Sequence, residues 1–332
     1  MTKILIVTDA WEPQVNGVVT TLLTVIKHLQ EKGHSVEVIS PDLFTTVPLP
    51  VYPEIKLAVF PKRKMARLID AFAPEKIHIA TEGPLGWAAR AICLKKGWRF
   101  STSYHTKFPE FANETARIPL RLGYFVVKHF HRKSSAMMVA TKSLDDDLRE
   151  RGFTNTVTWT RGVDTELFNC QRKPALKLEK PVMVYVGRVS VEKNIEAFLN
   201  LDLPGSKLVV GGGPQLKKLQ RNYPNVTFTG PKFGEELAAH YRSGDIFVFP
   251  SQTDTFGLVM LEAMACGLPV AAYPVTGPLD VVAECTAGKM DWDLAKAVKQ
   301  ALKADQKAAR DHALKFSWRA CSDTFLSNLT PL

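Results

Sequence analysis

The chain has 332 residues, of which 45% are apolar and 23% carry a charge, a balance that is ordinary for a globular protein. This composition excludes collagen-like repeats, coiled coils and low-complexity disorder. The sequence shows no apolar run near the roughly 18 to 20 residues of a membrane helix and no secretory leader, so we expect a cytoplasmic protein. Five cysteines without a close pair predict neither a disulfide framework nor a zinc site.

The net charge of +10 is concentrated in one part of the chain. Residues 56–133 hold 16 lysines and arginines against 5 acidic residues, a surplus of 11, so the rest of the chain is close to neutral. A local basic surface is typical of proteins that contact an anionic partner such as a nucleic acid, a phosphate or an acidic membrane. A solvated basic face without a partner is the alternative.

The first half of the chain alternates apolar runs with amphipathic segments. Residues 3–8 form a continuous apolar, β-branched run, and the apolar residues of 18–30 recur at helical spacing. Further strands are predicted at 36–39, 77–80, 98–103 and 137–140, and further helices at 86–96, 120–133 and 143–151. This alternation predicts a doubly wound α/β domain.

A polar stretch with two prolines, residues 169–181, predicts a linker. After it the alternation resumes. Strands are predicted at 182–186, 207–211, 226–229 and 246–250, and helices at 195–200, 216–222, 235–242, 258–266 and 294–303. We therefore expect two similar α/β domains with a ligand-binding cleft between them, near the carboxyl ends of the strands.

The stretch from Phe249 to Val270 carries the most specific pattern. A predicted strand ends at Pro250, a polar loop carries Asp254, and a helix that opens near Gly257 contains Glu262. Backbone N–H groups at a helix start suit anions, and two carboxylates can accept hydrogen bonds from sugar hydroxyls. For either carboxylate alone, a helix cap or a surface position is the alternative.

This stretch resembles the signature of the family 4 retaining glycosyltransferases, in which Glu follows an acidic residue after seven others and precedes Ala-Met-Ala-Cys-Gly-Leu-Pro-Val. One departure is Asp254, where the family usually has Glu. Its side chain is shorter by one methylene, so the resemblance leaves the sugar specificity open. Six further segments resemble family segments in the same order, namely residues 13–17, 104–106, 161–168, 187–194, 211–214 and 226–230. The resemblance therefore covers both halves of the chain.

The resemblance implies a GT-B fold, in which two Rossmann-like doubly wound domains face each other across a cleft. The expected acceptor-side domain spans residues 1–168 and is completed by a C-terminal crossing helix at 309–332. The expected linker is 169–181, and residues 182–308 form the expected donor domain, which binds the nucleotide sugar. Transfer then retains the anomeric configuration, with the departing phosphate oxygen taking the acceptor proton.

The resemblance also implies roles for individual residues. Arg188 and Lys193 are expected to neutralise the diphosphate, and His105 to face the sugar; with Asp254 they form the predicted catalytic set. The predicted donor-binding residues are Asn16, Gly17, Gly187, Gly213, Phe256, Gly257, Leu258 and Glu262. Glu262 is expected to hold the ribose. Because two cationic side chains can stabilise the departing diphosphate, no metal and no cofactor are expected.

Other catalytic patterns carry less weight. The acidic run 145–147 matches the Asp-x-Asp of metal-dependent glycosyltransferases, but it follows Ser143 at a predicted helix start, where acidic residues favour the helix dipole. The sequence contains neither a Gly-x-Gly-x-x-Gly after the first strand nor a Walker loop, which argues against a nicotinamide dehydrogenase and a P-loop enzyme.

The basic segment predicts a surface for the acceptor. Arg117, Arg121, Lys128 and Arg132 fall within about 60° of one another at roughly 100° per residue if one helix carries them all. Lys62, Arg63 and Lys64 add a second cluster. Aromatic and aliphatic residues accompany the stripe, a combination typical of helices that lie on an anionic membrane. Nothing in the sequence resembles a nucleic-acid module.

The segment around His105 resembles the lipid-directed branch of the family, which includes glycosyl diacylglycerol and sulfolipid synthases and mannosyltransferases. We therefore expect a peripheral enzyme on the inner face of the plasma membrane. Its expected acceptor is diacylglycerol, followed by a lipid-linked saccharide or polyisoprenyl carrier. The alternatives are a soluble transferase acting on a small polyol, a sugar phosphate or a polysaccharide or lipopolysaccharide precursor, and a non-catalytic sugar-nucleotide-binding protein. The sequence leaves the sugar, the base and the oligomeric state open.

Overall fold

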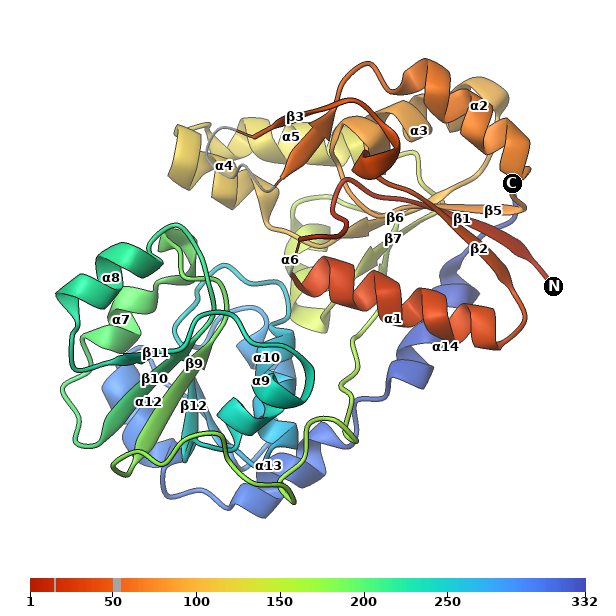
Figure 1. The fold of residues 1–332 in the computed structure, drawn as a ribbon. Helices are drawn as coiled ribbons and strands as arrows, with labels where there is room; N and C mark the ends of the chain where they lie inside the picture. Colours follow the sequence, from red (N-terminus) through yellow and green to blue (C-terminus); the bar gives the residue numbers. More distant parts are fainter. Residues whose placement is uncertain (15, 50–54) are drawn as a thin grey trace. The chain divides into compact units, whose positions relative to one another are not determined.

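The computed structural model describes residues 1–14, 16–49 and 55–332, and the chain divides into two compact units (Figure 1). Unit 1 comprises Met1–Arg161 and Trp318–Leu332, and unit 2 comprises Gly162–Ser317. Each unit contains a six-stranded parallel sheet with helices between successive strands. The predicted α/β class with two Rossmann-like domains is therefore confirmed.

The sheet of unit 1 has the strand order β2-β1-β5-β6-β7-β8. Its strands are β1 (Lys3–Val7), β2 (Ser35–Ile39), β5 (Lys76–Ile79), β6 (Ser101–Tyr104), β7 (Ala136–Val139) and β8 (Thr156–Thr158). All neighbouring strands pair in parallel. Sequence reasoning missed β8, because its three residues have the polar alternation of an edge strand rather than an apolar run.

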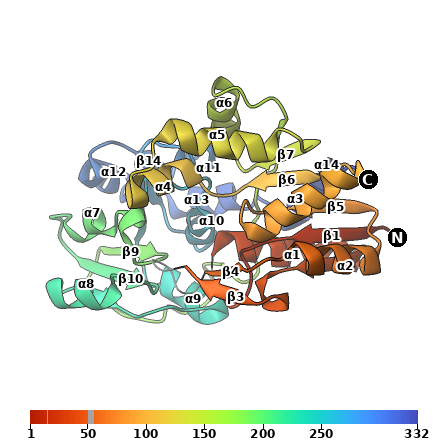
Figure 2. The same cartoon turned by 90° about the horizontal axis from the view of Figure 1, so that it is seen from above.

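The helices of unit 1 include several that the apolar periodicity did not predict. They are α1 (Gly17–Glu31), α2 (Lys62–Phe72), α3 (Pro84–Lys96), α4 (Phe108–Ala116), α5 (Leu120–His131), α6 (Lys142–Glu150) and α14 (Trp318–Asn328), with the short turn η1 (Pro41–Leu43). A two-stranded hairpin of β3 (Thr46–Pro48) and β4 (Lys56–Ala58) precedes α2. Figures 1 and 2 both show α4 and α5 side by side.

Strand β1 is apolar throughout because both of its faces are covered. Leu5 and Val7 belong to one buried cluster, and Ile4 and Ile6 belong to another, as the alternation of side chains along a strand requires. The second cluster also contains Phe325 of α14. The C-terminal helix therefore completes the core of unit 1 from the far end of the chain.

The sheet of unit 2 has the order β11-β10-β9-β12-β13-β14. Its strands are β9 (Val182–Val186), β10 (Ser206–Val210), β11 (Thr227–Phe228), β12 (Ile246–Phe249), β13 (Val270–Ala272) and β14 (Gly288–Met290). Its helical segments are η2 (Val191–Lys193), α7 (Ile195–Leu199), α8 (Leu216–Asn222), α9 (Gly234–Tyr241), α10 (Leu258–Ala265), α11 (Pro278–Val281), α12 (Leu294–Ala301) and α13 (Gln306–Ala313). Sequence reasoning placed four of these strands and missed β13 and β14.

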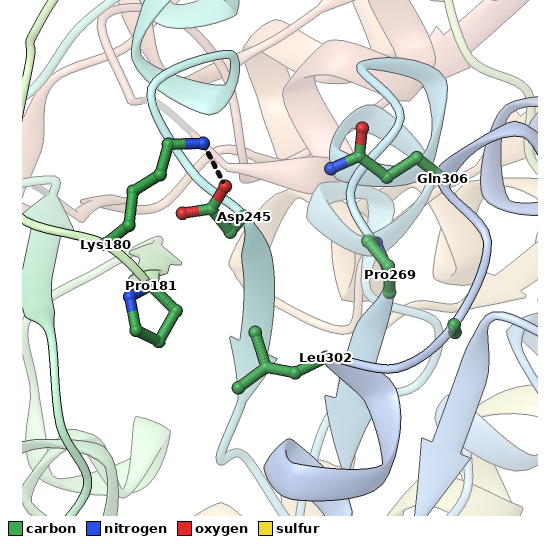
Figure 3. Close-up of a pocket in the computed structure, with 7 residues that line it drawn as sticks. Lys180, Pro181, Asp245, Pro269, Leu302 and Gln306 are labelled. Carbon is green, nitrogen blue, oxygen red and sulfur yellow. Dashed lines mark hydrogen bonds and ion pairs between the residues drawn. The ribbon is translucent and has the colours of Figure 1, made fainter.

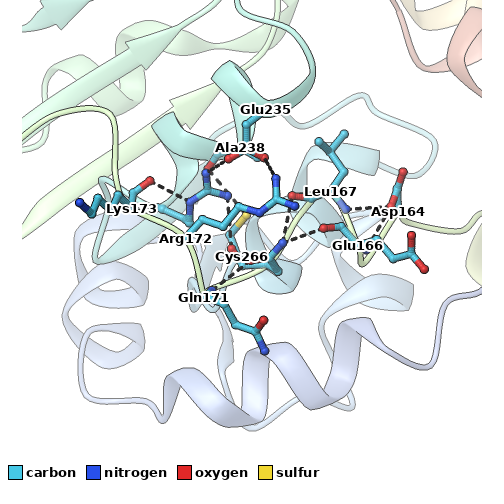
Figure 4. Close-up of polar contacts among 11 residues, drawn as sticks. Asp164, Glu166, Leu167, Gln171, Arg172, Lys173, Glu235, Ala238 and Cys266 are labelled. Carbon is cyan, nitrogen blue, oxygen red and sulfur yellow. Dashed lines mark hydrogen bonds and ion pairs between the residues drawn. The ribbon is translucent and has the colours of Figure 1, made fainter.

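The division between the units differs from the expected boundaries at 168 and 181. Arg242 donates hydrogen bonds to the carbonyl oxygens of Asn169 and Lys173, at 3.4 and 3.1 Å. The backbone N–H of Ala175 donates to Ala239 at 2.9 Å. Figure 4 shows further polar contacts of this segment, among them the ion pair of 2.8 Å between Arg172 and Glu235 of α9. The stretch expected to be a linker is therefore packed along unit 2.

The expected crossing helix, 309–332, is two helices. The first, α13, ends at Ala313 in unit 2, and the second, α14, begins at Trp318 in unit 1. Between them the carbonyl oxygen of Phe316 accepts a hydrogen bond of 3.2 Å from the backbone N–H of Val163. Residues 314–317 therefore separate the two helices, which belong to different units.

Candidate active site

The predicted donor loop, residues 250–257, connects β12 to α10. Its last residue, Gly257, has a φ of +86°, a conformation that residues with a Cβ atom rarely adopt. A Cβ atom there would also lie 2.7 Å from the Cε of Met260. Leu258 then begins α10, and the N-cap residue Gly257 has no side chain with which to cap the first turn. Its backbone N–H groups suit a hydroxyl or an anionic oxygen.

A second loop, which follows β13, supports the donor loop. Gly277 has a φ of +95°, and a Cβ atom on it would lie 3.1 Å from the carbonyl oxygen of Phe256 and 3.3 Å from that of Asp254. Phe256 is buried, and its ring centroid lies 6.5 Å from that of Phe316. Sequence reasoning missed Gly277, although the turn-forming Thr-Gly-Pro at 276–278 was an available signal.

Lys193 and Asp254, which are 61 residues apart in the chain, form an ion pair. The Nζ atom of Lys193 lies 2.5 Å from Oδ1 of Asp254. The next residue, Asn194, has a φ of +51° and donates from Nδ2 to the carbonyl oxygen of Pro250 at 3.2 Å. These contacts join the loops that follow β9 and β12, so the predicted clamp lysine touches the predicted sugar-binding carboxylate.

Arg188 belongs to the same loop as Lys193. Its carbonyl oxygen accepts a hydrogen bond of 2.7 Å from the hydroxyl of Tyr185. A Cβ atom on Gly187 would lie 3.2 Å from this hydroxyl, and one on Gly213 would lie 2.4 Å from the carbonyl oxygen of Val189. Both glycines have positive φ, at +151° and +155°. The close packing of the loops after β9 and β10 therefore explains why glycine occupies positions 187 and 213.

Glu262, on α10, accepts a hydrogen bond of 2.8 Å at Oε2 from the hydroxyl of Tyr241, the last residue of α9. Burial raises the pKa of the Glu262 carboxyl to about 7, and the hydrogen bond from Tyr241 opposes that shift. Tyr241 is fully buried. Sequence reasoning missed it, because a tyrosine at the end of an amphipathic helix looks like an ordinary core residue.

His105, in unit 1, directly follows the carboxyl end of β6. Its Nδ1 atom lies 3.2 Å from Nη2 of Arg161. The pKa of His105 is held well below its usual range, first by burial and then by the positive charge of Arg161 and the neighbouring His78 and His131. The imidazole is therefore neutral at physiological pH. Sequence reasoning placed Arg161 in a family segment but assigned it no role.

Asn16 and Gly17 also belong to unit 1. The side-chain oxygen of Asn16 accepts hydrogen bonds from the backbone N–H groups of Val18 and Val19, both at 3.0 Å. Asn16 is therefore the N-cap of α1, and Gly17 is the first residue of that helix. Val15, in the same family segment, lies outside the described residues. The remaining predicted catalytic and donor-binding residues, apart from His105, belong to unit 2.

The acidic run 145–147 lies in α6 and is paired with basic residues of the same helix turns. Asp145 contacts Arg149 at 2.9 Å, and Asp147 contacts Arg151 at 3.0 Å. The N-cap of α6 is Thr141, so the helix begins one residue before the predicted start at 143. Within residues 1–14, 16–49 and 55–332, no cluster of three or more His, Cys, Asp or Glu side chains is arranged to hold a metal.

The predicted basic stripe is not carried by one helix. Arg117 is the C-cap of α4 with a φ of +54°, and Pro119 precedes α5, so the expected alignment of four residues is wrong. Arg121 and Lys128 lie on α5, and Arg132 is its C-cap. Pro119 was the missed signal, since the residue before a proline avoids helical geometry.

Exposed apolar side chains gather on α4, α5 and the turn between them, here called the apolar α4–α5 face. Their exposed fractions range from 37% to 68%. The members are Phe108, Ile118, Leu120, Leu122, Phe125 and Val126. Gly123 and Pro109 hold the two helices together, since a Cβ atom on Gly123 would lie 2.8 Å from that of Pro109. The basic residues at 117, 121 and 132 are also exposed.

The second predicted basic cluster lies on α2. Lys62, Arg63 and Lys64 are exposed in its first turn. The ammonium of Lys64 contacts the carbonyl oxygen of Leu43 and lies 5.5 Å from the centroid of the Phe44 ring. In the part of the chain that the structure describes, no helix has the length and apolarity to span a membrane.

A hollow of about 360 Å³ lies at the amino ends of the strands of the unit 2 sheet (Figure 3). Its lining includes Lys180, Asp245 and Pro269. These residues lie one or two positions before the first residues of β9, β12 and β13. Lys180 and Asp245 form an ion pair of 2.7 Å. Because ligands of open α/β sheets bind at the carboxyl ends of the strands, this hollow is separate from the predicted donor site.

Two family sequence profiles match the chain. The profile described as Glycosyltransferase Family 4 matches residues 15–167, and the profile described as Glycosyl transferases group 1 matches residues 180–304. Together they cover most of both units.

Known relatives align over nearly the whole chain. A GDP-mannose-dependent α-mannosyltransferase of Mycobacterium tuberculosis is 29% identical over 98% of this chain and 96% of its own length. Sulfoquinovosyl transferase SQD2 of Arabidopsis thaliana is 30% identical over 93% of this chain and 69% of its own. The α-monoglucosyldiacylglycerol synthase of Streptococcus pneumoniae is 26% identical over 89% and 77%.

Solved structures share the fold. Sucrose-phosphate synthase of Thermosynechococcus elongatus matches with a TM-score of 0.78 and 21% identity over 98% of both chains. Anabaena HepE, solved with UDP and glucose, matches with a TM-score of 0.72 and 16% identity over 98% of this chain and 99% of its own. These likenesses show the GT-B fold. With the matched profiles and relatives, they establish that the chain belongs to the group 1, family 4 glycosyltransferases and is a hexosyltransferase.

Proposed function

We propose that this enzyme moves a hexosyl group from a nucleotide-diphosphate sugar to a membrane lipid, with retention of configuration and without a metal ion. Diacylglycerol is the first candidate acceptor. The observation that carries the lipid assignment is the apolar α4–α5 face, which begins three residues after His105. An exposed patch of six large apolar side chains rimmed by basic residues marks a contact surface rather than an ordinary solvated face.

The donor half of the proposal rests on unit 2. Arg188 and Lys193 come from one loop and supply two positive charges without a metal. Glu262 offers a carboxylate to ribose hydroxyls, and the first turn of α10 offers backbone N–H groups. The relatives include an enzyme named for GDP-mannose, whereas HepE was solved with UDP. The base of the nucleotide sugar is therefore guanine or uracil, and experiment distinguishes the two.

The proposed reaction takes place on one face of the sugar. The bond between the anomeric carbon and the diphosphate oxygen breaks while a bond to the acceptor hydroxyl oxygen forms on the same side. The proton of that hydroxyl passes to the departing phosphate oxygen, whose charge Arg188 and Lys193 stabilise. Lys193 is paired with Asp254 in the structure, so we propose that the diphosphate competes with Asp254 for its ammonium.

The acceptor half rests on the chemistry of the α4–α5 surface. At roughly 100° per residue, Leu122, Phe125 and Val126 share one face of α5, and Arg121 and Lys128 both lie along the edge of that face next to Phe125. Apolar side chains in the centre and basic ones at the rim fit an acyl and phosphate boundary, where each Lys or Arg contributes about 1 kcal/mol on an anionic surface. A soluble polar acceptor gives no reason for the apolar centre.

Sedimentation with vesicles tests the membrane assignment. The protein is expected to bind vesicles that contain phosphatidylglycerol more tightly than vesicles of phosphatidylcholine alone, and to dissociate as salt is raised. Phe125→Ser is expected to weaken binding, whereas Leu314→Ser, at a similarly exposed leucine of unit 2, is a matched control. Equal binding to both vesicles, or binding to neither, contradicts the assignment.

Incubation with a panel of nucleotide sugars tests the reaction itself. Release of UDP or GDP without an acceptor identifies the base, and addition of diacylglycerol is expected to move the label into the organic phase. Label that moves instead to a water-soluble polyol or sugar phosphate favours the alternative of a soluble transferase. The anomeric configuration of the product, read by NMR coupling constants, tests retention separately.

A further inference from the structure

The contact between Arg161 and His105 has a fixed chemical direction. Nη2 of Arg161 lies 3.2 Å from Nδ1 of His105. A guanidinium carries only donors and keeps its proton in proteins, whereas a ring nitrogen can donate or accept. Nδ1 must therefore be the acceptor. In a neutral imidazole, an accepting Nδ1 places the ring proton on Nε2.

Packing holds the guanidinium in place. Nη1 of Arg161 donates to the carbonyl oxygen of Trp159 at 2.5 Å, and the guanidinium carbon lies 4.1 Å from the centroid of the Trp159 ring. That ring is fully buried and donates from Nε1 to the carbonyl oxygen of Cys321 at 3.1 Å. Burial lowers the pKa of Arg161 to about 10, so the side chain keeps its charge at neutral pH.

We infer that Arg161 is a positioning residue for His105, which it holds in the neutral form with the proton on Nε2. A proton on Nδ1 would set two donors against each other across 3.2 Å, and in the imidazolium it would also set two positive charges against each other. With Nδ1 occupied, His105 acts through Nε2 as a hydrogen-bond donor. The next step rests on the proposed function: with its proton on Nε2, His105 donates a hydrogen bond to a sugar oxygen and does not abstract a proton.

Two neighbouring histidines show that this arrangement is particular to His105. Both ring nitrogens of His78 lie 2.9 Å from the hydroxyls of Ser101 and Ser103, and a hydroxyl can donate or accept, so neither tautomer is imposed. The Nε2 of His131 lies 3.1 Å from Oε1 of Glu82, a carboxylate that stabilises a proton on that nitrogen. Neither contact contains a cation.

NMR on the whole chain labelled with ¹⁵N-histidine tests the inference without any substrate. Long-range proton–nitrogen correlations distinguish the two neutral tautomers from the imidazolium. The wild-type signal of His105 is expected to show an unprotonated Nδ1 and a protonated Nε2 from pH 8 down to pH 5. A proton on Nδ1, or an imidazolium at pH 7, overturns the inference, and this measurement needs no variant to fold.

Variants separate positioning from a merely structural role. Arg161→Met removes the charge and the donor, so the His105 signal is expected to titrate at a higher pH than in the wild type. Arg161→Lys keeps both and is expected to keep the wild-type tautomer. An unchanged His105 signal in folded Arg161→Met contradicts the inference. Because the readout is spectroscopic, a failure of the proposed transferase activity leaves the NMR result intact and is distinguished from it.

Discussion

The hydroxyl of Tyr241 donates a hydrogen bond of 2.8 Å to Glu262 inside unit 2. The bond joins the last residue of α9 to the middle of α10, and it partly offsets the burial that raises the pKa of Glu262 to about 7. A carboxyl group poised at that value changes its charge near neutral pH. Stability and donor binding are therefore both expected to depend on pH through this residue.

Glu262→Gln is expected to stabilise the protein at high pH. Because the folded carboxyl has the higher pKa, the folded state binds more protons than the unfolded state between about pH 4.5 and 7, so the wild type loses stability as pH rises through that window. The variant has no such loss and is expected to gain about 2 to 3 kcal/mol over the wild type at pH 8. Below pH 4 the two should unfold at similar denaturant concentrations.

Urea unfolding at pH 4 and pH 8 measures this difference. Glu284→Gln, at an exposed position of the same unit, is the matched control, and its small difference in stability from the wild type should be the same at both pH values. A Glu262→Gln effect that is the same at both pH values would show that Glu262 does not titrate in this range.

Tyr241→Phe is expected to weaken donor binding at neutral pH. Loss of the hydroxyl removes a hydrogen bond to the charged form of Glu262, which moves its pKa further upward. If the carboxylate holds the ribose, the KM for the nucleotide sugar should rise several-fold at pH 7 and approach the wild-type value at pH 9. A KM that is unchanged across this range would argue against a link between Tyr241 and the ribose site.

Lys193→Ala is expected to reduce kcat by about two to four orders of magnitude, because it removes half of the proposed diphosphate clamp. Lys180→Ala provides a closely matched control. Lys180 also forms an ion pair within unit 2, at 2.7 Å from Asp245, but at the amino ends of the strands. Circular dichroism should show both variants folded. Near-normal turnover of Lys193→Ala would refute the clamp.

Gly213→Ala is expected to destabilise unit 2 by about 1 to 3 kcal/mol and to weaken donor binding. Its Cβ atom would lie 2.4 Å from the carbonyl oxygen of Val189, so the loops after β9 and β10 must separate. The adjacent Gly212 is the control, since a Cβ atom there meets Pro231 at an ordinary 3.6 Å. Equal melting temperatures of the two variants would contradict this account.

The sequence was sufficient for the parts of the fold that depend on local pattern. Continuous apolar runs such as residues 3–8 and 182–186 predicted strands covered on both faces, and the structure confirms them. The family signature around Asp254 and Glu262 identified the family that the comparisons establish. Helical spacing failed where a local break was overlooked, as at Pro119, which separates Arg117 from the helix of Arg121.

Contacts between distant segments required the tertiary structure. The pairs Lys193–Asp254 and His105–Arg161 join residues 61 and 56 positions apart, and the sequence contains no sign of which partner each side chain meets. The sequence by itself determined the class, the family and the positions of the chemical groups, because these follow from residue types and short-range periodicity. The tertiary structure alone decided the burial of these groups and the charges within a few ångströms of them, and ionisation depends on both.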